Sequence, residues 1–385
     1  MVNKTVLFRM DGDKSWIAQV YYVKNILFSI LNSDNAKDIN IVILTTENNY
    51  DSIKSYEKYK NVKIVKYNRS KLNLFIEKVS KKLFKRPINI ELLTQVNRYE
   101  VDYIYPITDY PYLGLKNKCI YWIPDFQHIN LPQMFSEKEI KERNDLFSYM
   151  IKSNNKLVLS SNDTFKVLKE NYNQVNAEIE VVPFISNISD ELSEITEERF
   201  NKIKEKYKIE EKFIFVPNQF WKHKDHITVF KAIKYIKETY KENIKFIFTG
   251  SKSDYRNKDY FNTLVEYIKE NDIEDSINIL GFIDRIDQLT LMAYSQFIIQ
   301  PSLYEGWSTV VEDAKSLKKK IILSNIEVHI DQKNDVCIYF EKSNYKDLAL
   351  KIMDNIDKEC EFCNKGNHFK NSKYDKNNLA NLILR

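Results

Sequence analysis

The sequence has few of the residues that build structural metal sites. It contains four cysteines in 385 residues. Cys119 and Cys337 lie in apolar, strand-like runs, as buried thiols do. Cys360 and Cys363 form a C-x-x-C pair with His368 nearby, which gives at most three zinc ligands and no second cysteine pair. We therefore expect no bound metal.

Long apolar runs are also missing. The first apolar run, 6–8, is stopped by Arg9, so no secretory hydrophobic region is recognised. The longest uncharged run, 288–304, contains Gln, Ser and Pro and is too polar to span a bilayer. Together with the few thiols, this predicts a cytoplasmic protein. There is no short internal repeat and no low-complexity tract.

Charge of one sign does not dominate either. The 59 Lys and Arg against 54 Asp and Glu give a net charge of +5, which is too balanced to predict nucleic-acid binding. Hydrophobic residues make up 43% of the chain and aromatic residues 13%, which is enough to bury a core. The length suits two domains.

One stretch departs from this balance. Between Lys63 and Arg86 there are nine Lys or Arg and a single acid, Glu77. Apolar residues recur at helical spacing from Leu72 to Leu83, with lysines on the remaining surface. A basic amphipathic helix can lie on an anionic membrane, which predicts peripheral contact with the inner membrane face through 63–86. The alternative is an ordinary surface helix with a solvated charged side.

Short apolar runs alternate with longer amphipathic segments along the chain. This pattern predicts an α/β protein with two doubly wound, Rossmann-like domains and parallel sheets, about 1–185 and 186–365. The polar segment 187–208 would connect them, and an apolar helix within 370–385 could pack back on the first domain. Ligands of such sheets bind beyond the carboxyl ends of the strands, so the active site is expected in a cleft between the domains. The predicted strands are 5–8, 39–44, 62–65, 119–123, 156–159 and 179–182, then 213–216, 244–249, 277–280, 297–300 and 320–323.

The most specific motif follows the predicted strand 297–300 and opens a helix. Glu305 would lie on the loop and point toward a ligand. Gly306 is expected to permit a turn that other residues resist. The backbone amides of 307–310 would then be free to bind an anion or hydroxyl groups at the helix start.

Two acidic residues of the predicted helix, Glu312 and Asp313, have different expected roles. Thr309 and Glu312 match the S/T-x-x-E capping box, so Glu312 is expected to hold the helix end. Asp313 projects differently and could reach the same ligand as Glu305. The alternative is an ordinary strand–turn–helix with incidental acids.

A second motif follows the predicted strand 213–216. Lys222, His223, Lys224 and His226 can neutralise a diphosphate, whose charge develops as a glycosidic bond breaks. A lysine at 4 Å is worth on the order of 4 kcal/mol in a medium of intermediate dielectric. No metal-binding Asp-x-Asp accompanies the motif, so lysines rather than a divalent cation would carry this charge. A solvated basic loop is the alternative.

Two further loops follow strands of the first domain. Asp125 and His128 come directly after the strand 119–123 and could orient a sugar hydroxyl or act as acid and base, although Asp125 could instead cap the next helix. The segment Gly12–Trp16 follows the first strand and is a phosphate-loop candidate with a single glycine.

Taken together, these residues resemble the retaining nucleotide-sugar glycosyltransferases of family 4, the group 1 glycosyltransferases, whose two-Rossmann-domain fold is called GT-B. The resemblance covers nearly the whole chain and is strongest over 213–332. Glu305 and Gly306 match the family's Glu-Gly-aromatic motif, and Asp313 stands at its second acidic position. Lys224 falls on the diphosphate-binding lysine. The resemblance implies that Glu305 faces the donor sugar and Asp313 the ribose hydroxyls.

The resemblance implies a retaining transfer in which the departing diphosphate helps to deprotonate the acceptor. We expect a glycan or lipid-linked acceptor, in the synthesis of a surface polysaccharide or glycoconjugate. It implies no cofactor beyond the nucleotide-sugar co-substrate. The expected catalytic residues are Glu305, Lys224, Asp125 and His128. The expected donor-binding residues are Gln219, Lys222, Lys224, Gly250, Ser251, Phe282, Ile283, Gly306, Trp307, Ser308, Thr309 and Asp313.

Several family positions carry other residues. Gln219 replaces an arginine, Pro124 a histidine, and Ala18 and Gln19 two glycines. These changes leave open a non-catalytic binding partner with the same fold. A nucleotide-sugar epimerase is a third reading of the same architecture.

Overall fold

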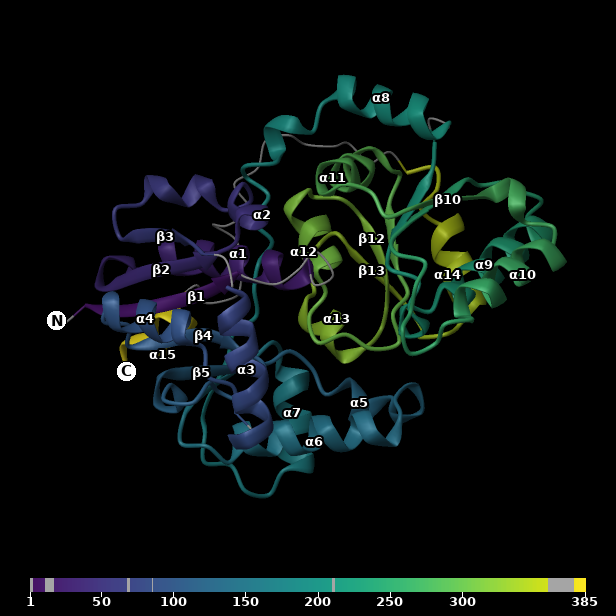
Figure 1. Cartoon of the computed structure of the whole chain (residues 1–385). Coiled ribbons are helices and arrows are strands. Elements are labelled where there is room, and N and C mark those ends of the chain that lie inside the picture. The colour runs from purple at the N-terminus through teal and green to yellow at the C-terminus, as the bar shows by residue number, and fades with distance from the viewer. Residues whose placement is uncertain (1–2, 11–16, 68–69, 85, 210–211, 359–376) are drawn as a thin grey trace. The chain divides into compact units, whose positions relative to one another are not determined.

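The computed structural model describes residues 3–10, 17–67, 70–84, 86–209, 212–358 and 377–385 (Figure 1). The chain divides into two compact units. Unit 1 comprises Met1–Phe126, Glu137–Ile185 and Ser372–Arg385, and unit 2 comprises Gln127–Ser136 and Ser186–Asn371. Some predicted features lie outside what the structure describes: Gly12–Trp16, the side chains of Ala18 and Gln19, Cys360, Cys363, His368, and 370–376 of the predicted C-terminal helix.

Unit 1 is built on a seven-stranded parallel sheet with the order β3-β2-β1-β4-β5-β6-β7. Its inner strands are short apolar runs covered on both faces, and all five residues of β5 are buried. The strands are β1 Lys4–Met10, β2 Ile39–Thr45, β3 Val62–Lys66, β4 Tyr103–Ile107, β5 Cys119–Ile123, β6 Lys156–Leu159 and β7 Glu178–Val181.

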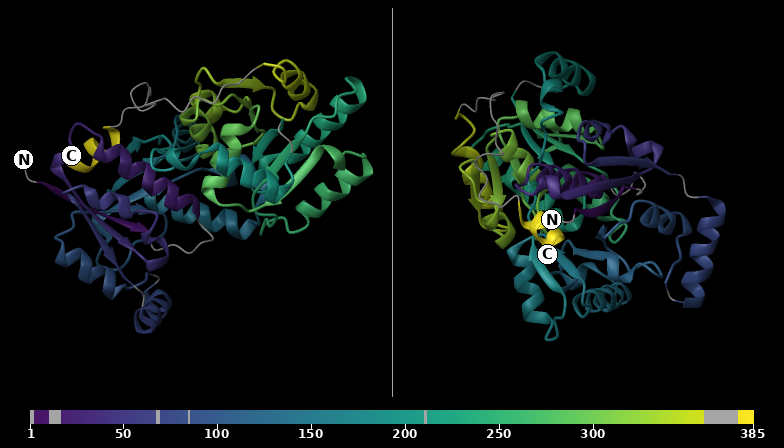
Figure 2. Two further views of the ribbon diagram at one scale, coloured as in Figure 1. Left: turned by 90° about the horizontal axis from the view of Figure 1, so that it is seen from above. Right: turned by 90° about the vertical axis from the view of Figure 1, so that its left-hand side faces the viewer.

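The helices of unit 1 include one from the C-terminal end of the chain. In α15, Leu379, Ala380, Leu382 and Ile383 are buried, and the Lys156 ammonium donates to the Leu382 carbonyl. Figure 2 shows this yellow helix beside the purple N-terminal elements. The helices are α1 Ile17–Leu31, α2 Glu47–Tyr50, α3 Lys71–Phe84, α4 Ile90–Arg98, α6 Glu137–Ile151, α7 Asn162–Asn171 and α15 Asn378–Leu384.

Unit 2 is built on a six-stranded parallel sheet with the order β10-β9-β8-β11-β12-β13. The strands are β8 Ile214–Pro217, β9 Phe246–Thr249, β10 Ile277–Gly281, β11 Ile298–Gln300, β12 Ile321–Ser324 and β13 Cys337–Phe340. The helices are α5 Gln127–Asn130, α8 Glu197–Tyr207, α9 His226–Thr239, α10 Tyr260–Glu270, α11 Arg285–Tyr294, α12 Thr309–Ser316, α13 Glu327–Asp331 and α14 Tyr345–Met353.

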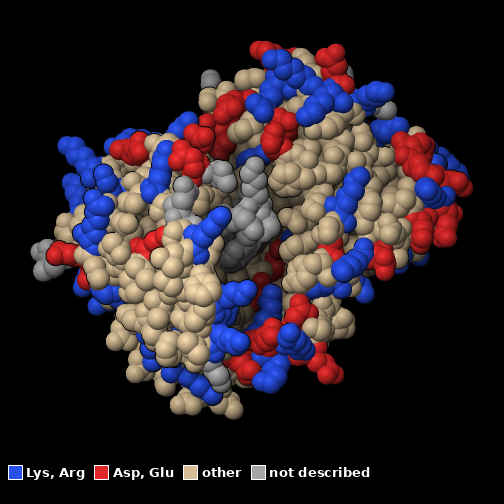
Figure 3. All heavy atoms as spheres, viewed as in Figure 1, with Lys and Arg blue, Asp and Glu red and all other residues tan. Residues whose placement is uncertain are grey.

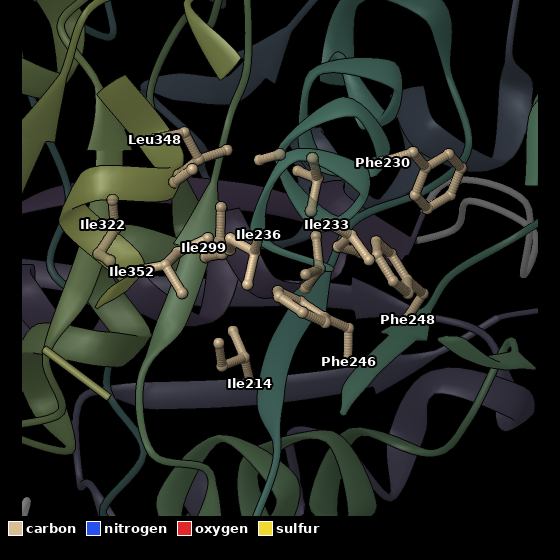
Figure 4. Close-up of a cluster of buried hydrophobic side chains, with 14 of the residues drawn as sticks. Ile214, Phe230, Ile233, Ile236, Phe246, Phe248, Ile299, Ile322, Leu348 and Ile352 are labelled. Atoms are coloured by element: carbon tan, nitrogen blue, oxygen red, sulfur yellow. The ribbon is translucent and has the colours of Figure 1, made fainter. Parts of the chain in front are cut away.

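Hydrophobic cores cover both faces of the unit 2 sheet. Side chains alternate along a strand, so Ile214 and Val216 pack on α9, α10 and α14, the core drawn in Figure 4. Phe213 and Phe215 point to the other face, onto α8, α11 and α12. Burial on both faces leaves only the strand ends and their loops to carry polar chemistry.

The prediction of two parallel-sheet α/β domains is confirmed. One strand, β4, was not predicted, and β13 was indicated only by the strand-like run that contains Cys337. In β4, Pro106 interrupts the apolar pattern, and proline rarely occupies a central strand because it has no N–H to donate. The strand tolerates Pro106 because its register with β5 shifts between Ile104 and Ile107.

Charges of both signs are spread over the surface. Figure 3 shows Lys and Arg as well as Asp and Glu side chains on the visible face, separated by areas of other residues, in keeping with the small net charge. Among the described helices, none combines the length and apolar character that crossing a bilayer requires.

Candidate active site

The strand order of unit 2 reverses between β8 and β11. The chain runs from β8 outward to β9 and β10, then returns to β11 and runs outward to β12 and β13 on the other side. Ligands of doubly wound sheets bind where such a reversal separates two loops. The loop after β8 carries Lys224, and the loop after β11 carries Glu305. The fold therefore brings these two residues, 81 positions apart in the sequence, into contact.

Glu305 is held by three donors on one oxygen. Lys224 Nζ lies 2.5 Å, Ser302 Oγ 2.6 Å and Gln300 Nε2 2.8 Å from Glu305 Oε1. The side chains of Glu305 and Lys224 are 10% and 17% exposed. All three of these hydrogen bonds go to Oε1, and no described residue is found to donate to Oε2.

The electrostatic environment keeps Glu305 ionised. Burial alone would raise the pKa of its carboxyl, but the Lys224 ammonium, together with the His223 and His329 rings in the acidic range where they are protonated, lowers it to about 2. Burial lowers the pKa of His223 to about 3 and that of His329 to about 4, so both rings are neutral at pH 7. Glu305 is therefore a carboxylate that accepts hydrogen bonds at neutral pH and is not a general acid.

Hydrogen bonds from neighbouring loops fix the Glu305 loop. Ser324 Oγ donates to the Ser302 carbonyl at 2.6 Å, and the Leu303 amide donates to the His223 carbonyl at 2.8 Å. His329 Nδ1 lies 2.8 Å from the Ser324 carbonyl. Because a carbonyl only accepts, Nδ1 carries the proton. These contacts tie the loops after β8, β11 and β12 to each other.

The start of α12 differs from the expected capping box. Ser308, not Thr309, is the N-cap, and its Oγ accepts from the Val311 amide at 3.5 Å. Glu312 instead accepts from Lys315 and Gln332, both at 2.8 Å. The prediction was wrong by one residue because Ser308 can cap the helix equally well. The amides of Thr309 and Val310 are left without an intrahelical partner, as in the helix starts that bind anions, and their expected contact with a ligand stays a prediction.

Gly306 also differs from expectation. The described glycines with a positive φ are Gly114, Gly250 and Gly281, so Gly306 does not use the left-handed conformation that was expected of it. The loop between β11 and α12 spans 301–308, which is long enough to turn without that conformation.

Asp313 is engaged by protein groups on both oxygens. Arg285 Nη1 lies 2.6 Å from Oδ2 and Nη2 lies 2.5 Å from Oδ1, which also accepts from Ser186 Oγ at 2.5 Å. The Asp313 side chain is fully buried. This geometry gives Asp313 a structural role between α11, α12 and the start of unit 2. Its expected contact with a ribose stays a prediction.

The other expected donor-binding residues differ in exposure. Lys222 is exposed and Gln219 is half-buried. Phe282 is 64% exposed, whereas the neighbouring Ile283 is buried in the core beneath β10. Trp307 is buried.

The two predicted catalytic residues from the loop after β5 fall in different units. Asp125 belongs to unit 1, where its carboxylate lies 3.6 Å from Arg143. His128 is buried in α5, which belongs to unit 2. Within the described residues, no group of three or more His, Cys, Asp or Glu side chains is placed to hold a metal ion.

Arg256 is a buried residue of this region that sequence reasoning missed. Its side chain is 4% exposed, and Nη1 donates to Gln127 Oε1 at 2.9 Å. The guanidinium also lies over the rings of Phe135, at 4.7 Å, and Trp221, at 5.2 Å. Arg256 thus holds the segment 127–136 beside the loop that carries Lys224.

Gly250, expected at the donor site, packs directly against the backbone of the loop after β8. It has φ +132°, and a Cβ there would lie 2.4 Å from the Asn218 carbonyl oxygen and 2.7 Å from Gln219 Cα. The Gly250 amide donates to the Gly281 carbonyl at 2.8 Å. The loops after β8, β9 and β10 therefore meet at a point that only glycine fits.

We expect Gly250→Ala to lower the free energy of unfolding by more than about 2 kcal/mol, because backbone strain and a backbone clash act together. Gly114→Ala is the matched control. Gly114 also has a positive φ, but a Cβ there meets only Leu93 Cδ2, at 3.7 Å. It should cost about 1 kcal/mol. Chemical denaturation would measure both, and equal losses would contradict a special role for the close approach at Gly250.

Comparison with known proteins indicates the class to which this fold belongs. Residues 197–375 match the family model of glycosyl transferases group 1, a stretch that covers most of unit 2. No curated protein matches the chain in sequence. The family model supports a glycosyltransferase, and its span includes both Lys224 and Glu305.

Solved structures share the architecture of the whole chain. A glycosyltransferase from Rickettsia africae is 18% identical, with a TM-score of 0.61 over 100% of this chain and 93% of that one. HepE from Anabaena, in complex with UDP and glucose, is 14% identical with a TM-score of 0.61 over 99% and 95%. WaaG, a glycosyltransferase involved in lipopolysaccharide biosynthesis, is 10% identical with a TM-score of 0.60 over 98% of each chain. The fold is therefore GT-B, as the resemblance implied.

Proposed function

We propose that this protein is a retaining glycosyltransferase that moves a sugar from a nucleoside-diphosphate sugar to a glycan or lipid-linked acceptor. The contact between Glu305 and Lys224 at the reversal of the unit 2 sheet carries the proposal. The family match over 197–375 supports it. Solved relatives bind UDP or act in lipopolysaccharide synthesis, which favours a surface polysaccharide or glycoconjugate as product.

Each group has a separate role in the proposed reaction. As the bond between the sugar and the diphosphate breaks, negative charge grows on the departing phosphate, and Lys224 with the amides of Thr309 and Val310 stabilises it. These groups take the place of a divalent cation. Glu305 Oε2 accepts hydrogen bonds from the donor sugar and orients it, while the departing diphosphate helps to deprotonate the acceptor. We also propose that the protein works in the cytoplasm, in peripheral contact with the membrane through 63–86.

A thermal-shift panel of UDP-, GDP- and dTDP-sugars tests the proposal. A true donor at about 100 times its Kd should stabilise the protein by about 2.7 kcal/mol. Donor turnover and the anomeric configuration of the product would then test transfer and retention. If no donor stabilises the protein or is consumed, the non-catalytic binding partner becomes the better description. Conversion of a lone donor without acceptor would instead indicate an epimerase.

A further inference from the structure

Helix α3 of unit 1 presents its apolar side to solvent, the reverse of an ordinary surface helix. Its two buried residues are polar, Asn73 and Ser80. Both views of Figure 2 show α3 standing out from the rest of unit 1. The exposed apolar side chains are Leu72 at 68%, Leu74 at 45%, Phe75 at 64%, Val79 at 38%, Leu83 at 68% and Phe84 at 58%.

Four of these side chains form one continuous face. Leu72, Phe75, Val79 and Leu83 follow each other at spacings of three, four and four residues, which places them along one side of the helix. We call this set the α3 apolar face. Scattered single apolar residues on a surface need no explanation, but a contiguous row on a protruding helix indicates a binding surface.

The polar side of α3 fixes the helix to the rest of unit 1. Asn73 Nδ2 donates to Asn89 Oδ1 at 3.1 Å, and Asn89 Nδ2 donates to Glu77 Oε1 at 2.6 Å. Ser80 Oγ accepts from the Ile88 amide at 2.8 Å. Turning the apolar face inward would break these bonds. The face is therefore held outward and does not have to form on binding.

The charge beside the α3 apolar face has one sign. Lys78, Lys81 and Lys82 are exposed, and none of them forms an ion pair within the part of the chain that the structure describes. The only acid of the helix, Glu77, is bonded to Asn73 and Asn89 on the opposite side. Long lysine side chains beside an apolar face can reach the headgroups of a lipid surface while the face itself enters the acyl region.

We propose that the α3 apolar face inserts into an anionic lipid surface and that Lys78, Lys81 and Lys82 bind its headgroups. A second copy of this chain fits the face poorly, because a symmetric contact would bring like charges together. The inference assigns a surface and a mode to the proposed membrane contact. It does not depend on sugar transfer, so vesicle binding and donor turnover can fail independently.

Co-sedimentation of the full-length protein with vesicles tests this inference. Wild-type protein should bind phosphatidylcholine vesicles that contain phosphatidylglycerol and bind pure phosphatidylcholine far more weakly. The combined changes Lys78→Gln, Lys81→Gln and Lys82→Gln should weaken binding to the anionic vesicles about 100-fold, from about fivefold for each lysine. Lys166, Lys269 and Lys342 are also exposed, and changing all three to glutamine is the control with the same loss of charge.

A separate variant tests how much the apolar side chains contribute to vesicle binding. Phe75→Ser combined with Leu83→Ser should weaken binding at least about tenfold, since two large side chains would no longer leave water. Leu350, 48% exposed on α14 of unit 2, provides the control Leu350→Ser, which should bind like wild type. Thermal melting checks that each variant is folded. If the double serine variant does not fold, the lysine variant and the comparison of vesicle types still decide.

Three results would overturn the inference. One is equal binding of the wild-type protein to neutral and anionic vesicles, and another is full binding by a folded Phe75→Ser/Leu83→Ser protein. The third is a wild-type protein that binds neither vesicle type but forms dimers, when the Phe75→Ser/Leu83→Ser variant does not. This result would assign the α3 apolar face to a contact with a second copy.

Discussion

Replacing Lys224 by glutamine is expected to lower kcat for sugar transfer by about 100- to 1000-fold, with a smaller effect on the KM for the donor. The reason is that the charge of Lys224 is needed most when the diphosphate departs. Glu305→Gln should cause a loss of similar size, because it removes the carboxylate that lies 2.5 Å from the lysine. Steady-state consumption of a donor identified by thermal shift would measure both effects.

A variant that carries both changes tests whether the two residues act together. Since Lys224 and Glu305 act as one unit, Lys224→Gln combined with Glu305→Gln should lose little more than the worse single variant. Lys269→Gln, an exposed change on α10 with the same loss of charge, is the control and should leave kcat unchanged. A Lys224→Gln protein with near-normal kcat would rule out the electrostatic role proposed for this residue.

Arg285→Leu should lower the free energy of unfolding by about 3–5 kcal/mol, because it leaves a buried carboxylate without its partner. The side chain of Arg285 is 13% exposed and that of Asp313 is fully buried, so water cannot replace the guanidinium well. Chemical denaturation would measure the loss. Lys237→Met breaks an ion pair with Asp275 whose side chains are 38% and 48% exposed, and it should cost less than about 1 kcal/mol.

Asp313→Asn distinguishes the structural role of this carboxylate from the donor contact that the family resemblance implies. If Asp313 mainly holds Arg285 and Ser186, the variant loses stability even without a nucleotide. If it mainly binds a ribose, the variant keeps its melting temperature and loses donor affinity. The second result would contradict the structural role assigned here.

The fold could be predicted because buried parallel strands appear in a sequence as short runs of apolar residues. The runs that became β5 and β8 are examples in which every residue is buried. The pattern failed where other forces override it. In β4 a proline occupies a central strand, and β13 is an edge strand whose first three residues are only half-buried, which gives a weak apolar signal.

The site could be predicted only in part, because sequence shows which loops follow strands but not which loops meet. Glu305 and Lys224 were found from their positions after strands. The polar Gln300 and Ser302 at the end of an apolar strand were a signal that was not used. Nothing in the local sequence around His329 or Arg285 indicated that they would reach the loop of Glu305 or the carboxylate of Asp313, since those contacts depend on how α13 and α11 pack.

The assignment of Gln127–Ser136 to unit 2 has a practical consequence. A fragment beginning at Ser186 would keep both sheet loops with Lys224 and Glu305, yet it would lack Gln127 and Phe135, on which the Arg256 guanidinium rests. A recombinant second half, or a chimaera that exchanges the halves as contiguous blocks, would leave that guanidinium without Gln127 and Phe135, with Trp221 as its remaining ring contact of the three. An exchange of donor specificity between proteins of this architecture should therefore replace individual loops. Joining two halves of different proteins at a single junction would disturb these contacts.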